Sequence, residues 1–402
     1  MRQLVHRSIC TLLFLPLYWA QPGETALGVP VGHPDFFPSK EHPVGWRGNG
    51  TGAWPGAAPV TEWNAQTGKN IVWKTAMPGP SFSQPIVVGD KVFTLADPNW
   101  LICVNARNGK IIWQKAADHT LVMPSEKATQ ARKAIDFWDD QFRQYSIWLD
   151  VKSEMNPKLP QEQIDRALAA AEEHGYSVNG PGAANFSMMR LGKTGHDPLW
   201  DRLWKDQTDY SLYYFGHWEG ILTQTLATPV SDGEYVFVTM SNDQVGCYDL
   251  DGNSKWLLWD RPLKAVPAKS EHVRYALSPC LVDDKLIVAA CGELRAYDKT
   301  SGKKLWSVLH KSDFGAHWVK VSPPVPMRLT FQGKAFDILL SPGSGIYRAS
   351  DGKLVGNLPE LPGYEGSTAL IDGEVYIRRD APDGAGSKRV AGKFEVIDSE
   401  HV

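Results

Sequence analysis

The chain has 402 residues with nearly balanced charge, 42 lysines and arginines against 45 aspartates and glutamates. It carries no long basic run, so its composition argues against a nucleic-acid partner. The 36 glycines, 28 prolines and 16 tryptophans favour many short strands, joined by tight turns and packed through aromatic rings.

The first 20 residues have the pattern of a signal peptide. A basic start is followed by the apolar stretch Ile9–Trp19, and Ala20 offers a small residue for cleavage. The apolar stretch is too short for a permanent membrane span. We therefore predict an exported protein, periplasmic or extracellular, whose residues 21–62 form an N-terminal extension.

A repeated unit dominates the rest of the chain. Residues 278–306 read as three strands and the start of a fourth, and the turn glycines Gly252, Gly302 and Gly352 recur at intervals of 50 residues. A period of this length predicts an all-β propeller with four-stranded blades. Five copies are recognisable, and their first strands begin at Pro85, Pro229, Pro279, Pro324 and Thr368.

The two ends of the repeat array are complementary. Thr67–Trp73 has the form of a fourth strand without preceding strands, whereas the copy that begins near residue 367 lacks a fourth strand. We predict that Ile71–Lys74 pairs antiparallel with Phe394–Ile397 and closes the ring, because open strand edges are unfavourable. The alternative is an array with unpaired ends.

Aromatic and cysteine positions also repeat. We expect the fourth-strand tryptophans to be buried between neighbouring sheets; these are Trp73, Trp113, Trp256 and Trp306. Cys103 and Cys247 share a third-strand position that Ala296 holds in another copy, which predicts a small buried residue. Cys280 and Cys291 lie on adjacent strands, where free thiols or a disulfide are both compatible with the pattern. No Cys/His spacing resembles a zinc site, so no metal site is predicted.

Residues 116–223 interrupt the propeller, which we assign to residues 63–115 and 224–402. Apolar residues recur at helical spacing over residues 125–148 and 160–174, so this insertion is predicted to be mainly helical. It ends in an aromatic cluster, which either forms a lid over a flat ligand such as a sugar or packs against the propeller. The candidate residues are Tyr213, Tyr214, His217, Trp218 and Glu219.

A second candidate site lies at the entry to two first strands. His272 and His317 each precede the proline of a first strand by seven residues. Since first strands line the central channel of a propeller, these histidines, together with Arg274 and Lys320, are candidates for binding an anionic ligand at the channel face. The alternative is a structural role for both histidines.

A glycine-rich motif precedes the repeats. Residues 45–52 read GWRGNGTG, and Pro55 and Pro59 follow. A phosphate cradle of this kind needs a helix after the glycines, which the two prolines disfavour, so we predict a loop.

This motif, together with EWN, NIVWK and SFSQPIVVGDKVFTL further along, resembles the opening of secreted bacterial proteins with pyrroloquinoline-quinone-type β-propeller repeats, common in planctomycetes and related phyla. The resemblance covers roughly residues 45–115 and 225–402. It implies four-stranded blades, an architecture related to the outer-membrane assembly propeller lipoprotein and to quinoprotein dehydrogenases. It does not imply that the quinone is bound.

Three classes of function are compatible with these features. We favour a non-catalytic, exported propeller that acts as a scaffold in the cell envelope and binds a protein or glycan partner without a cofactor. A quinoprotein dehydrogenase with quinone and calcium is the first alternative, but none of the five cysteines are neighbours in sequence, unlike the adjacent pair that this enzyme family uses. A polysaccharide-active enzyme, the second alternative, needs paired carboxylates. No catalytic residue is identified.

Overall fold

The computed structural model describes the strands of the repeats and part of the N-terminal extension. The described residues are 24–26, 29–33, 37–54, 57–79, 81–96, 100–116, 125–126, 128–129, 217–218, 221–222, 227–240, 244–260, 277–290, 293–309, 323–341, 345–357, 369–371, 374–380, 387–392 and 394–396. Regular structure in them is almost entirely antiparallel β-sheet, which confirms the all-β prediction.

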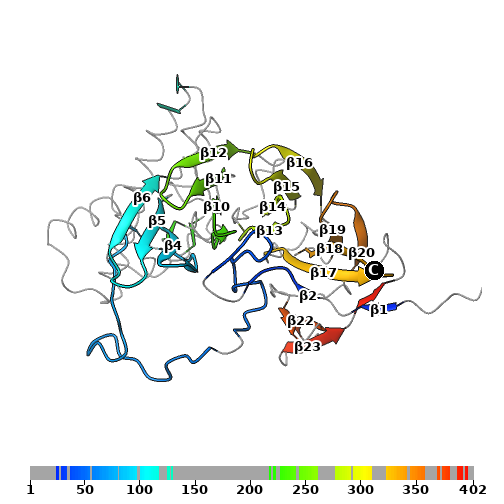
Figure 1. Ribbon diagram of the computed structural model, residues 1–402, viewed down its shortest axis with the longest axis horizontal. Helices are drawn as coiled ribbons and strands as arrows, with labels where there is room; N and C mark the ends of the chain where they lie inside the picture. Colours follow the sequence, from blue (N-terminus) through cyan, green and yellow to red (C-terminus); the bar gives the residue numbers. More distant parts are fainter. Residues whose placement is uncertain are drawn as a thin grey trace, which may run out of the picture.

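Five successive sheets begin where the five sequence copies begin and follow one another around an arc (Figure 1). The first contains β3 (Ile86–Val88), β4 (Lys91–Ala96), β5 (Trp100–Asn105) and β6 (Ile111–Ala116). The second contains β9 (Val230–Ser231), β10 (Tyr235–Thr239), β11 (Gln244–Asp249) and β12 (Ser254–Trp259). The third contains β13 (Cys280–Val282), β14 (Lys285–Ala290), β15 (Glu293–Asp298) and β16 (Lys304–Leu309).

The fourth and fifth sheets differ from the first three. The fourth contains β17 (Val325–Phe331), β18 (Lys334–Leu340), β19 (Gly345–Arg348) and β20 (Leu354–Asn357), extended by β2 (Val29–Pro30) from the N-terminal extension. The fifth has three strands, β21 (Ala369–Ile371), β22 (Glu374–Asp380) and β23 (Ser387–Gly392).

Neighbouring sheets pack face to face, and each interface has its own apolar cluster. Strand residues alternate between the two faces, so each sheet contributes side chains to the interface before it and to the interface after it. In β15, Tyr297 packs toward the second sheet, whereas Leu294 and Ala296 pack toward the fourth. Val375 of β22 joins the cluster of the fourth sheet. The core is therefore a series of clusters between sheets, as expected for propeller blades.

Each of the four repeated tryptophans covers the turn glycine of the next sheet along the chain. The Trp256 ring lies over Gly302, and its indole N–H donates to the carbonyl oxygen of Lys299 at 3.0 Å. Gly302 has a φ of 71°, and a Cβ atom there would lie 2.7 Å from the ring. The same contact joins Trp73 to Gly109, Trp113 to Gly252 and Trp306 to Gly352. The four tryptophans are half-buried over turns. Trp113, Trp256 and Trp306 also pack against the apolar clusters between neighbouring sheets, so the expected place between sheets is confirmed. Burial is partial, because each ring also lies over a turn, where its indole N–H has a carbonyl partner.

The predicted position of the small residues is confirmed. Cys103, Cys247 and Ala296 are fully buried, and each pairs with a fourth-strand tryptophan beside a β-bulge. Cys280 is a free thiol in β13. Cys291, the partner considered for a disulfide, lies outside the described residues.

The predicted pairing of Ile71–Lys74 with Phe394–Ile397 is wrong. β24 (Phe394–Val396) pairs with β1 (Glu24–Ala26) instead, and Ile71–Lys74 forms no strand. The third strand of the last sheet is β23, in which Gly392 pairs with Val375 of β22, and β24 forms a separate sheet with β1.

The segment Thr67–Trp73 nevertheless has the local turn structure of the other repeats. Gly68 N–H donates to Asn64 O, as Gly302 N–H does to Asp298 O, and the indole N–H of Trp73 donates to Ala106 O at 2.8 Å. The segment is therefore held against the first sheet.

The predicted helical insertion lies almost entirely outside the described residues. Near its start, residues 125–126 and 128–129 are helical. Near its end, β7 (His217–Trp218) pairs with β8 (Ile221–Leu222). A search of the described part of the chain for a helix long and apolar enough to cross a membrane found none.

Candidate functional site

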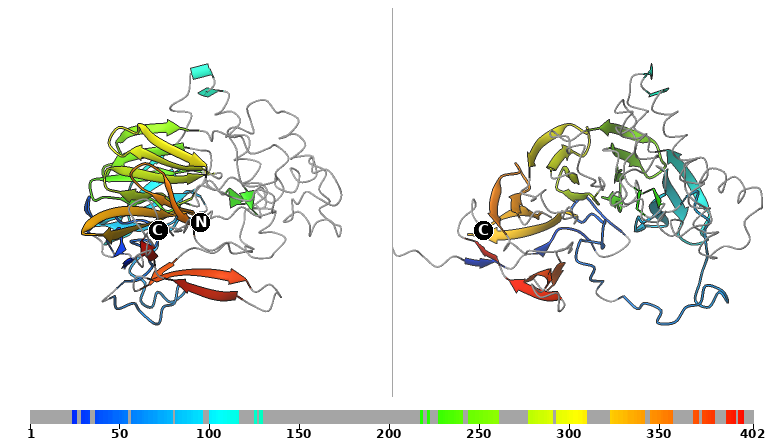
Figure 2. Two further views of the ribbon diagram at one scale, coloured as in Figure 1. Left: turned by 90° about the vertical axis from the view of Figure 1, so that its right-hand side faces the viewer. Right: turned by 180° about the vertical axis from the view of Figure 1, so that it is seen from behind.

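The strands of the five sheets end at two different faces of the molecule (Figure 2, left). One face carries the tight turns within each sheet, such as residues 283–284 between β13 and β14. The opposite face carries the strand ends between which the chain passes from one sheet to the next, such as Trp259 at the end of β12 and Cys280 at the start of β13. We refer to them as the tight-turn face and the long-connection face. Long connections on a rigid scaffold carry function more often than tight turns do.

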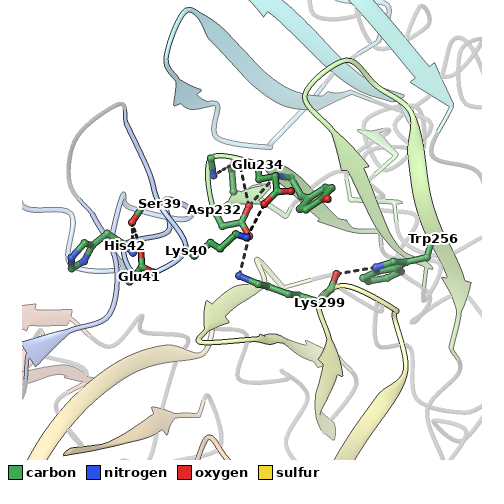
Figure 3. Close-up of polar contacts among 11 residues, drawn as sticks. Ser39, Lys40, Glu41, His42, Asp232, Glu234, Trp256 and Lys299 are labelled. Carbon is green, nitrogen blue, oxygen red and sulfur yellow. Dashed lines mark hydrogen bonds and ion pairs between the residues drawn. The ribbon is translucent and has the colours of Figure 1, made fainter.

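The N-terminal extension covers part of the tight-turn face (Figure 3). Lys40 Nζ lies 2.9 Å from Glu234 Oε2 at the turn between β9 and β10, and the hydrogen bond to this carboxylate raises the pKa of Lys40. Gly233 has a φ of 86°, and a Cβ atom there would lie 2.3 Å from the carbonyl oxygen of Pro38. Glycine at position 233 therefore lets the extension approach the turn closely.

A buried ion pair lies beneath this contact. Lys299 Nζ is 3.0 Å from Asp232 Oδ2, and both side chains are buried (Figure 3). Oδ1 of Asp232 also accepts hydrogen bonds from the backbone N–H groups of Glu234 and Tyr235. Buried ion pairs persist when such additional hydrogen bonds offset the cost of removing the charges from water. The pair joins a turn of the second sheet to a turn of the third.

The extension then enters the space between the first strands (dark blue in the middle of the arc in Figure 1). Val44 exchanges two backbone hydrogen bonds of 2.8 Å with Ser231 at the inner edge of the second sheet. A Cβ atom on Gly50 would lie 3.6 Å from Val325 of β17, and Trp46 packs against the cluster of the fourth sheet. Residues 45–52 thus lie between the inner strands of the second and fourth sheets, where the channel of a propeller runs.

Near the long-connection face, a buried polar network joins the second and third sheets. Arg295 and Glu293 are each 1% exposed and form an ion pair of 3.1 Å. Arg295 also donates to the carbonyl oxygen of Asp260, just past β12, and the hydroxyl of Tyr297 donates to the Asp260 carboxylate at 2.7 Å. Burial raises the pKa of Tyr297 above its usual range. Lys304 and Ser307 complete the network through Asp260 and Glu293.

The charges and hydrogen bonds of this network indicate a structural role. Two cations face two carboxylates, so the charges balance, and the hydrogen bonds hold the end of β12 against β15. The connection from β12 to β13 begins at this place. The network therefore fixes the end of β12 on the long-connection face.

The sequence-predicted candidate residues lie largely outside the described part of the chain. This holds for His272, Arg274, His317 and Lys320 at the channel face, and for Tyr213, Tyr214 and Glu219 of the aromatic cluster. His217 and Trp218 form β7. The strands that follow the two histidines, β13 and β17, start consecutive sheets, and the convergence of the four side chains stays a prediction.

Sequence reasoning missed the buried charges. Asp232 and Lys299 lie in turns, where charged residues are ordinarily exposed. Glu293 and Arg295 carried a weak signal, because they alternate with the apolar residues of a strand whose two faces are both buried. The position of Arg47 is likewise not specified by the motif GWRGNGTG, whose pattern is dominated by its glycines.

Comparison with known protein families agrees with the propeller repeats recognised in the sequence. The sequence matches the family of the outer membrane protein assembly factor BamB over residues 38–140 and 201–386, more than half of the chain. The chain belongs to this family. The match omits residues 141–200, which lie within the predicted insertion. Membership confirms the resemblance to proteins with quinone-type propeller repeats.

Solved structures with a similar arrangement are distant in sequence. BamB from Moraxella catarrhalis has 11% identity and a TM-score of 0.33, with 80% of this chain and 72% of that chain covered. The quinohemoprotein alcohol dehydrogenase from Comamonas testosteroni has 10% identity and a TM-score of 0.37, with 74% and 44% covered. The dehydrogenase ADHIIG from Pseudomonas putida HK5 has 12% identity and a TM-score of 0.33, with 79% and 39% covered. The chain thus spans less than half the length of either dehydrogenase. No curated protein matches it.

The quinone alternative requires a calcium site built from protein oxygens. Among the residues that the structure describes, no group of three His, Cys, Asp or Glu side chains is placed to hold a metal ion.

Proposed function

We propose that the protein is a non-catalytic propeller of the cell envelope that binds a protein or glycan partner through its long-connection face. The observation that best supports this proposal is the difference between the tight-turn face and the long-connection face. The extension lies over the tight turns and between β9 and β17. The strand ends from which the chain passes to the next sheet lie on the opposite face. Membership in a family named for an outer membrane protein assembly factor supports a role in binding a protein partner.

The predicted insertion extends this face. It follows β6 at Ala116, and the second sheet begins with β9 at Val230, so the longest connection between sheets is on the proposed binding side. The predicted candidates His272, Arg274, His317 and Lys320 lie within the next two connections of the same face. Export, predicted from residues 1–20, places this surface in the periplasm or outside the cell.

The first test locates the partner contacts of the protein in the cell envelope. Crosslinking of the tagged protein in the envelope, followed by mass spectrometry of the linked peptides, should place partner contacts in residues 117–226, 261–276 and 310–322. Contacts confined to the tight turns, such as residues 283–284, would contradict the proposal.

The second test addresses the enzyme alternative. Thermal unfolding is measured with pyrroloquinoline quinone and calcium, together and separately, and then with envelope glycans. We expect no shift with the quinone pair. A large, saturable rise in Tm with quinone and calcium together would overturn the non-catalytic assignment.

A further inference from the structure

Arg47 in the glycine-rich loop at residues 45–52 is a half-buried cation. Its guanidinium carbon lies 4.3 Å from the centroid of the Trp46 ring, a cation–π contact. No acidic side chain pairs with Arg47 among the residues that the structure describes. Burial lowers the pKa of Arg47, as expected for a cation that has lost water without gaining a counter-ion.

The loop holds this side chain in a defined place. Arg47 has a φ of 53°, a backbone conformation that non-glycine residues rarely adopt, and such strain gathers at ligand-binding positions. Its aliphatic stem lies over Gly52, where a Cβ atom would be 3.5 Å from Arg47 Cδ. Trp46 packs in turn against the cluster of the fourth sheet. The guanidinium therefore lies against a ring that is itself anchored.

The loop backbone decides which anion suits this arrangement. The N–H groups of Gly48, Gly50 and Gly52 donate to the carbonyl oxygens of Gly45, Trp46 and Arg47. A phosphate site would use several such N–H groups as donors, and here they are already engaged. One guanidinium edge can bind a carboxylate or a phosphate through two parallel N–H groups, and with the backbone donors engaged it is the two oxygens of a planar carboxylate that it satisfies in full.

We propose that Arg47 is the anchor of a carboxylate-binding site on the N-terminal extension, between the inner strands of the second and fourth sheets. The carboxylate belongs either to a small free acid or to the C-terminus of a bound peptide. This site lies on the N-terminal extension and not on the long-connection face, so it does not depend on the proposed function.

The test is isothermal titration calorimetry at low ionic strength with four probes. Succinate and its neutral diamide form one pair, and tetra-alanine with a free or an amidated C-terminus forms the other. We expect saturable binding of at least one carboxylate probe and none of its amide, with affinity falling as salt is added. Binding of succinate indicates a small acid, and binding of the free peptide alone indicates a protein C-terminus. Failure of both carboxylates to bind at millimolar concentration would overturn the proposal.

Three variants assign the binding to Arg47. Arg47→Gln should weaken the affinity at least about tenfold, since a charge-assisted pair is lost. Arg47→Lys keeps the charge but loses the planar fork, so an intermediate loss is expected, and this variant decides the matter if Arg47→Gln does not fold. Arg107→Gln, on an exposed turn of the first sheet, removes the same charge elsewhere and should bind as the parent does. Equal losses in Arg47→Gln and Arg107→Gln would refute a specific site.

Discussion

At the scale of single residues, one contact recurs between neighbouring sheets: a tryptophan ring packs on the turn glycine of the next sheet. Gly302 combines a positive φ with a ring at 2.7 Å from its missing Cβ, whereas Gly68 has a φ of 78° and nothing within 4 Å. These two glycines therefore separate the backbone requirement from the packing requirement.

Gly302→Ala should cost about 2–4 kcal/mol in the free energy of unfolding, because backbone strain of about 1–2 kcal/mol adds to the clash with Trp256. Gly68→Ala should cost only the backbone part. In the Trp256→Ala background, the cost of Gly302→Ala should fall to about that of Gly68→Ala. Urea unfolding of the four variants measures these differences, and equal costs at both glycines in the parent would contradict the contact.

The buried thiols at the repeated third-strand position make a pH prediction. Burial raises the pKa of Cys103 and of Cys247 from 9.0 to about 12. The unfolded chain releases these protons near pH 9 and the folded chain only near pH 12. The contribution of each thiol to stability is thus fully present below pH 9 and falls by about 1.4 kcal/mol per pH unit above it.

The double variant Cys103→Ala/Cys247→Ala should remove this part of the alkaline loss, since alanine occupies the same position at Ala296. Urea midpoints at pH 8 and pH 10.5 give the comparison. Other groups titrate equally in both proteins, so the same pH dependence in parent and variant would show that the thiols are not buried as described.

At the scale of elements, the N-terminal extension acts as an added strand on two inner edges. β2 pairs with β17, and Val44 pairs with Ser231 beside the Asp232–Lys299 ion pair. Unpaired inner edges would otherwise expose backbone donors and acceptors. The extension also reaches the C-terminal strand through β1 and β24. One segment thus contacts the second sheet, the fourth sheet and the C-terminal strand.

Val44→Asp should loosen this element. Val44 is 3% exposed and packs with the first and second sheets, so an aspartate there buries an unpaired charge and should cost about 2–4 kcal/mol. Val29→Asp is the matched control, because Val29 is 50% exposed. Hydrogen exchange at Ser231, whose N–H donates to Val44, should accelerate in Val44→Asp alone. Unchanged exchange would mean that the extension does not pair with β9.

At the scale of the whole molecule, five sheets follow one another and each packs mainly on its neighbours. Stability in such arrays is the sum of sheet and interface terms. The interface between the first and second sheets is built from strand residues such as Phe93 and Val236, with Val44 from the extension, and draws on no described residue of the insertion. From this arrangement we propose that residues 116–223 form an insertion that is separate from the propeller.

Deleting residues 117–223 and joining the ends with a Gly/Ser linker should leave a soluble, β-rich protein. We expect cooperative thermal unfolding and an unchanged far-ultraviolet strand signal, because the contacts between β3–β6 and β9–β12 remain. The parent protein serves as the reference for cooperativity. A deletion protein without a cooperative transition would show that the insertion belongs to the core.

The strand repeat, the five sheets and the small buried residues at Cys103 and Cys247 could be predicted from the amino-acid sequence. These features are local, since alternation, turn glycines and an interval of 50 residues can be recognised in neighbouring positions. Four other features became visible only in the folded chain: β24 pairs with β1, the extension enters between β9 and β17, Asp232 contacts Lys299, and Arg295 contacts Asp260. Such contacts join positions far apart along the chain, and no period specifies them. They form because the folded sheets bring turns and strand ends together, where buried charges and open edges must find partners.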